Sequence, residues 1–212
     1  MIDSVFQPCQ SATDQSQGHG RVVVNGKGRI IVVSGPSGVG KGTLLREVLQ
    51  ISELPLVLSV SATTRPPRPG ETNGVEYYFL TPDEFHQKHK NGEFLECFEV
   101  FHGGHWYGTL HQEVESKRDA GKWVVLEIDV QGGLAVQERF PDSVMIFIRP
   151  KDRDVLKERL AQRGTESPES AEIRLKQAIA ELDLAERYTH QVVNDDLAAA
   201  ARELCDILES LI

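Results

Sequence analysis

A glycine-rich segment with a single lysine, Gly35-Pro36-Ser37-Gly38-Val39-Gly40-Lys41-Gly42-Thr43, has the residue types needed to bind phosphate. It follows a run of β-branched residues at 30–33 and precedes residues with helical spacing. Glycines let successive backbone N–H groups point inward, the helix N-terminus adds positive potential, and Lys41 supplies a full charge. A glycine-rich structural turn is the alternative, but it does not explain why strand, lysine and helix occur in this order. The segment therefore predicts a loop for the phosphates of a nucleotide.

Two arginines lie in the proline-rich stretch Arg65-Pro66-Pro67-Arg68-Pro69. A proline after each arginine disfavours helix and favours extended or polyproline geometry. With about three residues per turn, both side chains project to the same side. Two converging guanidinium groups make a strong site for a phosphate dianion. A solvated basic loop is the alternative interpretation.

Two carboxylates, Glu127 and Asp129, end the apolar run at 123–126. Residues two apart on a strand face the same side, and ligands bind near the carboxyl ends of strands in doubly wound sheets. For Asp129, capping of the next helix is the alternative. Phosphate loops usually have Ser or Thr directly after the lysine, where this chain has Gly42 followed by Thr43. Whether a hydroxyl of this loop binds Mg²⁺ therefore stays open.

The pattern of apolar runs predicts an α/β scaffold for these residues. Runs at 57–60, 123–128, 144–148 and 191–193 alternate with helical stretches, which indicates a mostly parallel central sheet flanked by helices. Short strand-like pieces at 77–80 and 94–101 surround one helix, which Thr81-Pro82-Asp83-Glu84 begins with a capping box. This part predicts a small inserted mixed α/β lobe. Two charged helices at about 150–188 are typical of a helical lid.

The composition narrows the function classes. A chain of 212 residues suits one α/β domain, and its net charge of −9 argues against broad nucleic-acid binding. Three distant cysteines indicate a reducing compartment, and no stretch approaches the ~20 apolar residues that cross a bilayer. A cytoplasmic location is expected. Residues 1–27, rich in Gln, Ser and Gly, predict a disordered N-terminal extension.

From about residue 28 to the C-terminus, the sequence resembles the guanylate kinases. The matching residues are the loop at 35–43, Ser61, Arg65, Arg68, Asn73-Gly74, Tyr77, Glu96, Tyr107-Gly108-Thr109, Glu127-Ile128-Asp129, Gln131-Gly132, Arg163-Gly164 and Asn194-Asp195-Asp196. The resemblance implies a P-loop kinase that moves the γ-phosphoryl group of ATP, bound as Mg-ATP, onto GMP and dGMP in purine nucleotide metabolism. It also implies a core (28–58, 110–149 and 189–212), a GMP-binding lobe at about 59–109 and a lid at about 150–188.

The resemblance further implies a role for each site residue. Arg65, Arg68, Tyr77 and Tyr107 would hold the acceptor phosphate, and Ser61, Glu96 and Thr109 would read guanine. Glu127 and Asp129 would lie near the acceptor nucleoside or the hydrated Mg²⁺. The resemblance gives no certain protein ligand for this metal ion, and it places the ion near Thr43 and Asp129. Residues 35–43 and Asn194 would bind ATP. Lys41, Arg65, Arg159, Arg163 and Arg174 would act in catalysis, although Arg159 also fits a surface salt bridge.

The chemistry of the base agrees with these implied roles. Guanine presents N1–H and N2–H₂ as adjacent donors that one carboxylate accepts together, whereas adenine would leave Glu96 unpaired. Two alternatives remain: a catalytically silent protein-binding module of the same family, and a nucleoside monophosphate kinase with another base preference. Lys41 and Asp129 disfavour the first, and Glu96 with Thr109 disfavours the second. The expected partners are ATP and GMP, without nucleic acid or membrane, and the oligomeric state stays open.

Overall fold

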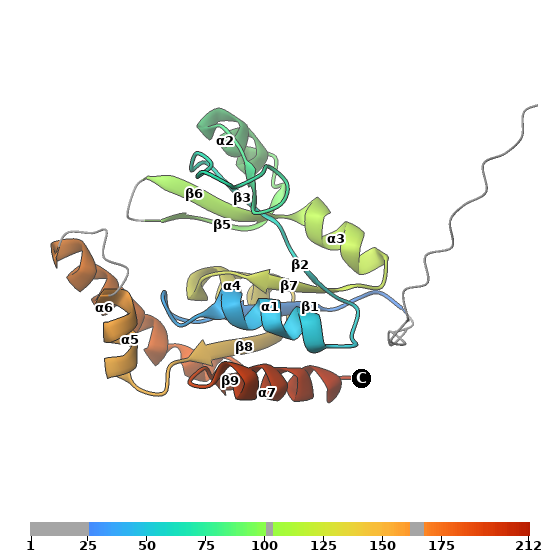
Figure 1. The fold of residues 1–212 in the computed structure, drawn as a ribbon. Helices are drawn as coiled ribbons and strands as arrows, with labels where there is room; N and C mark the ends of the chain where they lie inside the picture. Colours follow the sequence, from blue (N-terminus) through green and yellow to red (C-terminus); the bar gives the residue numbers. More distant parts are fainter. Residues whose placement is uncertain (1–25, 101–103, 162–167) are drawn as a thin grey trace, which may run out of the picture.

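The computed structural model describes residues 26–100, 104–161 and 168–212 (Figure 1). The predicted disordered extension lies outside the described residues, apart from its last two positions, and so do Arg163 and Gly164. Within the described part, two β-sheets lie one above the other, and helices pack around the lower one (Figure 1).

The lower, central sheet has five parallel strands in the order β2-β7-β1-β8-β9. These strands are β1 (Ile30–Ser34), β2 (Leu56–Leu58), β7 (Trp123–Glu127), β8 (Val144–Arg149) and β9 (His190–Val193). All five residues of β1 are buried, because helices cover both faces of the sheet. The predicted fold class, a mostly parallel central sheet flanked by helices, is confirmed.

The central sheet divides the apolar core into two layers, each covered by helices. One apolar cluster joins Ile31 and Val33 to Leu44 of α1 and Leu204 of α7, and the other joins Ile30 and Val32 to α3, α4 and η1. The bounds are α1 (Lys41–Ile51), α3 (His111–Asp119), α4 (Val130–Arg139), η1 (Ala185–Arg187) and α7 (Leu197–Glu209). Successive β1 side chains therefore feed opposite faces of the sheet, as strand geometry requires.

The upper sheet is smaller and mixed, in the order β4-β3-β6-β5. Its strands are β3 (Ser61–Thr63), β4 (Tyr77–Phe79), β5 (Phe94–Val100) and β6 (His105–Leu110). Helix α2 (Pro82–Lys90) packs on it through Phe85, whose ring stacks on Phe94 with centroids 4.4 Å apart. Thr81 and Glu84 form the predicted capping box. We call this unit, residues 59–110, the small lobe.

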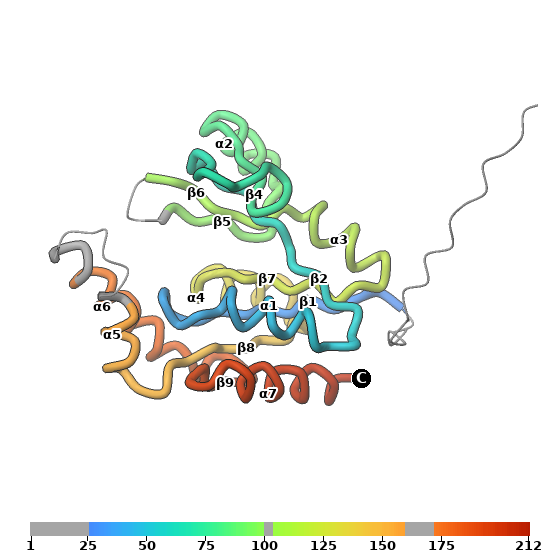
Figure 2. The backbone as a smooth tube through the Cα atoms, viewed as in Figure 1, coloured from blue at the N-terminus to red at the C-terminus, as the bar shows by residue number. Residues whose placement is uncertain are grey.

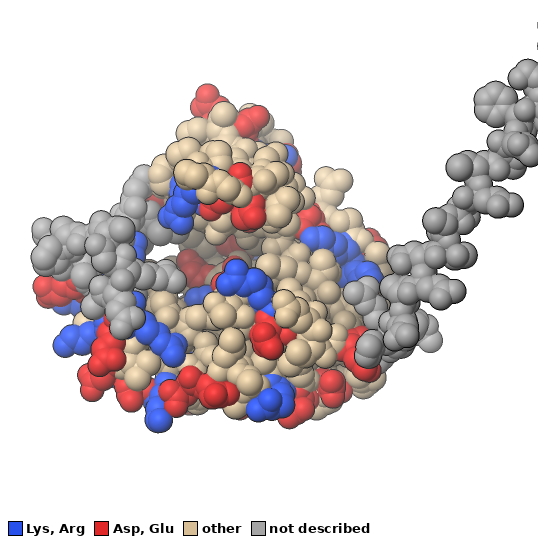
Figure 3. All heavy atoms as spheres, viewed as in Figure 1, with Lys and Arg blue, Asp and Glu red and all other residues tan. Residues whose placement is uncertain are grey.

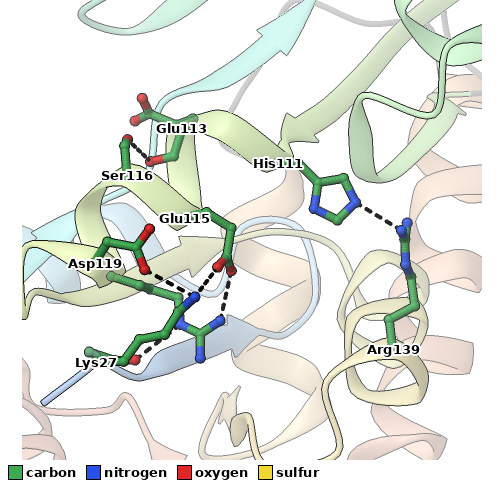
Figure 4. A network of polar contacts seen from close by, with 9 residues as sticks. Lys27, His111, Glu113, Glu115, Ser116, Asp119 and Arg139 are labelled. Atoms are coloured by element: carbon green, nitrogen blue, oxygen red, sulfur yellow. Dashed lines mark hydrogen bonds and ion pairs between the residues drawn. The ribbon is translucent and has the colours of Figure 1, made fainter.

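Helix α3 and the last turn of α4 tie the small lobe to the central sheet. Glu113 accepts hydrogen bonds from the Val60 N–H (3.0 Å) and the Tyr78 hydroxyl (3.1 Å). Arg139 donates to the carbonyls of Phe94 and Leu95, both at 2.9 Å, and its guanidinium also contacts the His111 ring (Figure 4). At the other end of α3, Lys27 lies between Glu115 and Asp119 (Figure 4). These two ion pairs hold the segment that leads into β1 against α3.

Helices α5 (Arg153–Ala161) and α6 (Pro168–Asp183) stand at one end of the central sheet (Figure 2). The side chain of Arg159 reaches Val39 from there, so this end is where the glycine-rich loop leaves β1. The division of the chain into core, lobe and lid as separate units stays a prediction. Among the described helices, none has the length and apolar character needed to cross a bilayer.

Candidate active site

A cleft of about 540 Å³ separates the small lobe from the carboxyl end of the central sheet. Figure 3 shows the hollow between the two parts, with charged atoms of both signs along it. Its lining includes these predicted site residues: Gly35, Ser37, Lys41, Ser61, Arg65, Arg68, Tyr77, Glu96, Tyr107, Glu127 and Asp129. The fold thus brings together side chains that lie far apart in the sequence.

The glycine-rich loop forms a tight turn between β1 and α1. Gly35 has φ 148°, and a Cβ there would lie 2.2 Å from the Ile148 carbonyl oxygen, so only glycine fits. Helix α1 begins after Gly40 with no side-chain cap and no acidic residue in its first turn. Its first N–H groups are therefore left for an anion. The Lys41 ammonium donates to the carbonyls of Gly35 (2.7 Å) and Pro36 (3.3 Å), which holds it at the mouth of the loop.

The back of this loop is held from distant parts of the chain. Asn194 is buried, and its side-chain amide donates to the Val39 carbonyl at 2.8 Å. The Arg159 guanidinium donates to the carbonyls of Val39 (3.2 Å) and Asn194 (3.4 Å). Within the described residues these contacts of Arg159 are with backbone carbonyls, and the surface salt bridge considered for it stays an untested alternative. Both residues support the loop in this conformation.

The acceptor side of the cleft is built around Arg65. Its guanidinium donates to Glu71 (2.9 Å) and to the Pro66 carbonyl (2.8 Å), and it lies over the Tyr77 ring at 5.4 Å. The hydrogen bond from Arg65 holds the pKa of the Glu71 carboxyl below its usual range, and the same contact raises the pKa of Arg65. Tyr107 meets the Tyr77 ring edge-on, with centroids 5.8 Å apart. The side chains are therefore ordered before any anion arrives.

Glu71 also accepts the Arg68 N–H at 2.7 Å, so it organises both arginines. Sequence reasoning missed this residue. Its signal was present, because Glu71 comes three residues after Arg68 across a turn. Gln177 and Glu181, which form a hydrogen bond on one face of α6 (3.2 Å), were also missed as cleft residues.

Glu96 lies on β5 directly opposite Thr109 on β6. Burial raises the pKa of the Glu96 carboxyl to about 7, and the neighbouring Asp129 adds to the rise, while the Thr109 hydroxyl and N–H beside it offset part of it. Thr109 itself is fully buried. Although its hydroxyl lies beside Glu96, it makes no hydrogen bond of acceptable geometry with any described group. The structure thus brings Glu96 to the cleft surface but leaves Thr109 just beneath it.

Asp129 caps helix α4 by accepting the Gly132 N–H at 2.7 Å, as the structural interpretation of this residue predicted. It also lines the cleft, so a structural and a binding role are compatible. Thr43, expected near a metal, is exposed outside the cleft, and its hydroxyl accepts a hydrogen bond from Arg46 (3.3 Å). Arg174 lies half-buried on α6, and Arg163 is not described.

A phosphate loop between the first strand and helix of a parallel sheet, facing a second anion pocket across one cleft, defines a P-loop kinase for two phosphorylated substrates. The family model described as guanylate kinase matches residues 27–211, so the chain belongs to the guanylate kinase family.

Known proteins with similar sequences and structures carry the same description. The guanylate kinase of Rhodopirellula baltica is 46% identical over 182 residues, which cover 85% of this chain and 87% of that protein. The guanylate kinase of Gloeobacter violaceus is 52% identical over 172 residues, covering 81% of this chain and 82% of its own. The crystal structure of guanylate kinase from Anaplasma phagocytophilum superposes with a TM-score of 0.70 at 34% identity, over 87% of this chain and 86% of that one.

Proposed function

We propose that this protein transfers the γ-phosphoryl group of ATP to GMP, and to dGMP, giving ADP and GDP or dGDP. The observation that carries the proposal is that one cleft holds a phosphate loop on one side and the Arg65–Arg68 pair on the other, with the Glu96 carboxylate between the small lobe and α4. This activity would serve the recycling of purine nucleotides in the cytoplasm.

On the donor side, the loop N–H groups and Lys41 bind the β- and γ-phosphates of ATP. The uncapped N-terminus of α1 adds positive potential at the same place. Asn194 and Arg159 keep the loop in shape through the Val39 carbonyl, because they replace the backbone partners that a tight turn lacks.

On the acceptor side, Arg65, Arg68, Tyr77 and Tyr107 bind the phosphate of GMP. The two arginines supply charge, and the phenolic hydroxyls add hydrogen bonds without further charge. Glu96 accepts N1–H and N2–H₂ of guanine, and Ser61 and Thr109 supply hydroxyl groups to the same base. For Thr109, this contact requires a small movement, because its hydroxyl is covered in the ligand-free conformation.

Transfer between the two sites depends on position and charge, since phosphoryl transfer needs little covalent help from the protein. The cleft lining has three cationic residues against six carboxylates; the cations are Lys41, Arg65 and Arg68, and the acids are Glu71, Glu76, Glu96, Glu127, Asp129 and Glu181. Two anionic substrates in such a cleft need further positive charge. Arg159, Arg163 and Arg174 are proposed to supply part of it as α5 and α6 approach the phosphates.

Mg²⁺ fits the same need, because the carboxylates at the end of β7 offer oxygen ligands facing the phosphate loop. Glu127 and Asp129 are the residues that would hold it, together with the phosphates of ATP. Bound there, the ion would neutralise charge on the β- and γ-oxygens.

The test is an ADP-release assay with Mg-ATP and a panel of GMP, dGMP, AMP, UMP and CMP. Release with GMP, or with GMP and dGMP, is the expected result. Release with AMP or a pyrimidine nucleotide instead would remove the guanine assignment of Glu96. Binding of GMP without release from any nucleotide would favour a protein-binding module.

A further inference from the structure

Two adjacent glycines in the first turn of α4 bring this helix close to its neighbours on two sides. Gly132 and Gly133 are both buried. A Cβ built on Gly132 would lie 3.1 Å from Oε2 of Glu96. A Cβ built on Gly133 would lie 2.4 Å from the Tyr188 hydroxyl and 2.8 Å from the Ser34 hydroxyl. Because successive helix positions point about 100° apart, the turn lies between Glu96 of the small lobe and two hydroxyls of the core.

The two core hydroxyls hold this end of α4 in place. Tyr188 donates to the Val130 carbonyl at 3.2 Å, and Ser34 donates to the Asp129 carbonyl at 3.1 Å. Both side chains are buried, and the Tyr188 ring meets the Phe147 ring edge-on with centroids 5.2 Å apart. Burial raises the pKa of Tyr188 to about 12, so its hydroxyl remains a donor at neutral pH. The start of α4 is therefore fixed by side chains from the end of β1 and from the residue that follows η1.

Helix α4 in turn determines how strand β5 and its glutamate lie. Arg139, in the last turn, donates to the carbonyls of Phe94 and Leu95, both at 2.9 Å. Glu96 is the next residue of β5, and it meets the first turn of the same helix at Gly132. No side chain at position 132 separates the carboxylate from the helix backbone. The place of this turn therefore sets the orientation that the Glu96 carboxylate adopts.

We propose that Tyr188, together with Ser34, is a positioning residue for guanine recognition. Its hydroxyl fixes the first turn of α4, and this turn holds the Glu96 carboxylate in the orientation that accepts both N–H donors of guanine. Tyr188 acts through the helix, because it is buried and is not among the residues that line the cleft. Gly133 belongs to the same unit, since only a residue without a side chain leaves room for the two hydroxyls. The inference rests on the proposed reading of guanine by Glu96.

The experiment compares GMP with IMP, whose base has the same N1–H but lacks the 2-amino group. In the ADP-release assay, the ratio of kcat/KM for GMP to kcat/KM for IMP measures the second hydrogen bond to the carboxylate, and hence its alignment. Tyr188→Phe keeps the ring and removes the hydroxyl. We expect the ratio to fall about fivefold, because a misaligned carboxylate loses part of one charge-assisted hydrogen bond. A general loss of stability would lower both values equally and leave the ratio unchanged.

A matched control is Tyr78→Phe, which removes another tyrosine hydroxyl, bonded to Glu113 at 3.1 Å. It should leave the GMP/IMP ratio unchanged, because this hydroxyl contacts α3 and not α4. Gly133→Ala displaces the two core hydroxyls without removing them and should lower the ratio by a similar factor. Combined with Tyr188→Phe it should lower the ratio no further, since both changes act through one contact. If Gly133→Ala does not fold, Ser34→Ala replaces it in this comparison.

Three results would overturn the proposal. They are a wild-type ratio in Tyr188→Phe, an equal fall of the ratio in Tyr78→Phe, and effects of the two combined substitutions that multiply. Glu96→Gln separates this failure from a failure of the proposed function, because an amide accepts through one oxygen only. If Glu96→Gln leaves the ratio unchanged, Glu96 does not read guanine and both proposals fall. If Glu96→Gln lowers the ratio and Tyr188→Phe does not, only the Tyr188 proposal falls.

Discussion

Replacing Glu96 by glutamine should make the protein more stable and less able to bind guanine, and both effects should depend on pH. Burial raises the pKa of this carboxyl from 4.5 to about 7 in the folded protein. At 1.36 kcal/mol for each pH unit, the charged form costs the fold about 3 kcal/mol. The side chain keeps some exposure to the cleft, and solvent there reduces the cost to about 2 kcal/mol.

The sign follows from the two pKa values. Below the unfolded value of 4.5 the carboxyl is protonated in both states, and no penalty exists. The penalty grows as pH rises from 4.5 to about 7 and is complete above that. Glu96→Gln should therefore raise the free energy of unfolding by about 2 kcal/mol near pH 8 and by nothing near pH 4. Urea unfolding at both pH values measures this, and Glu99→Gln, an exposed carboxylate on the same strand, is the control.

Guanine binding requires the opposite protonation state, because only the ionised carboxylate accepts both N–H donors. With a pKa of about 7 in the free protein, the ionised fraction falls about tenfold for each pH unit below that value. The dissociation constant of guanosine should thus rise about 30-fold between pH 8 and pH 5.5. Guanosine is the preferred ligand, since it lacks the phosphate of GMP, which titrates in the same range.

Glu96→Gln should bind guanosine weakly at every pH and without this slope. A wild-type affinity for guanosine that is flat between pH 5.5 and pH 8 would rule out the ionised Glu96 carboxylate as the acceptor of the base. An equal change in the free energy of unfolding of Glu96→Gln near pH 4 and near pH 8 would rule out a buried charge as the cause of the stability difference.

Three further predictions test other parts of the site. Lys41→Ala should lower kcat for ADP release by about 10² or more, because the phosphates lose a full positive charge, and an unchanged melting temperature would separate this from unfolding. Arg65→Lys should raise the KM for GMP about tenfold without changing guanosine affinity, since a point charge cannot replace the planar fork; an equal loss for guanosine would contradict this. Gly108→Ala places a Cβ 2.7 Å from the Cys97 Cβ and 2.8 Å from the Glu96 carbonyl oxygen, and should lower the free energy of unfolding by about 2 kcal/mol in urea titrations. An unchanged free energy of unfolding in Gly108→Ala would mean that β5 and β6 adjust their spacing.

Local sequence determined the parts of this protein whose chemistry lies within a few residues. The loop at 35–43 can be predicted from the sequence because its glycines, its lysine and the flanking strand and helix are contiguous. The capping box at Thr81 and Glu84 can be predicted because its two hydrogen bonds join residues only three positions apart. The β-branched runs predicted the central strands, since a parallel sheet buries both faces and leaves no polar alternation.

Strands β3 and β6 were not predicted, although the acceptor side of the site depends on them. Strand β3 has only three residues in a Ser- and Thr-rich segment, and β6 contains a glycine at 108. Such segments become strands because their neighbours offer hydrogen-bond partners, and a single sequence does not state which neighbours these are.

Tertiary structure alone decided which distant residues meet. Asn194 supports the Val39 carbonyl across 155 residues, and Glu127 fills the space beside Gly42 because β1 and β7 pair in one register. The raised pKa of Glu96 depends on burial against α4, which its own strand does not predict. Residue types and short spacings fix which chemistry is available, whereas packing of non-local elements fixes distance and desolvation, and these two quantities set the charge and reach of each group.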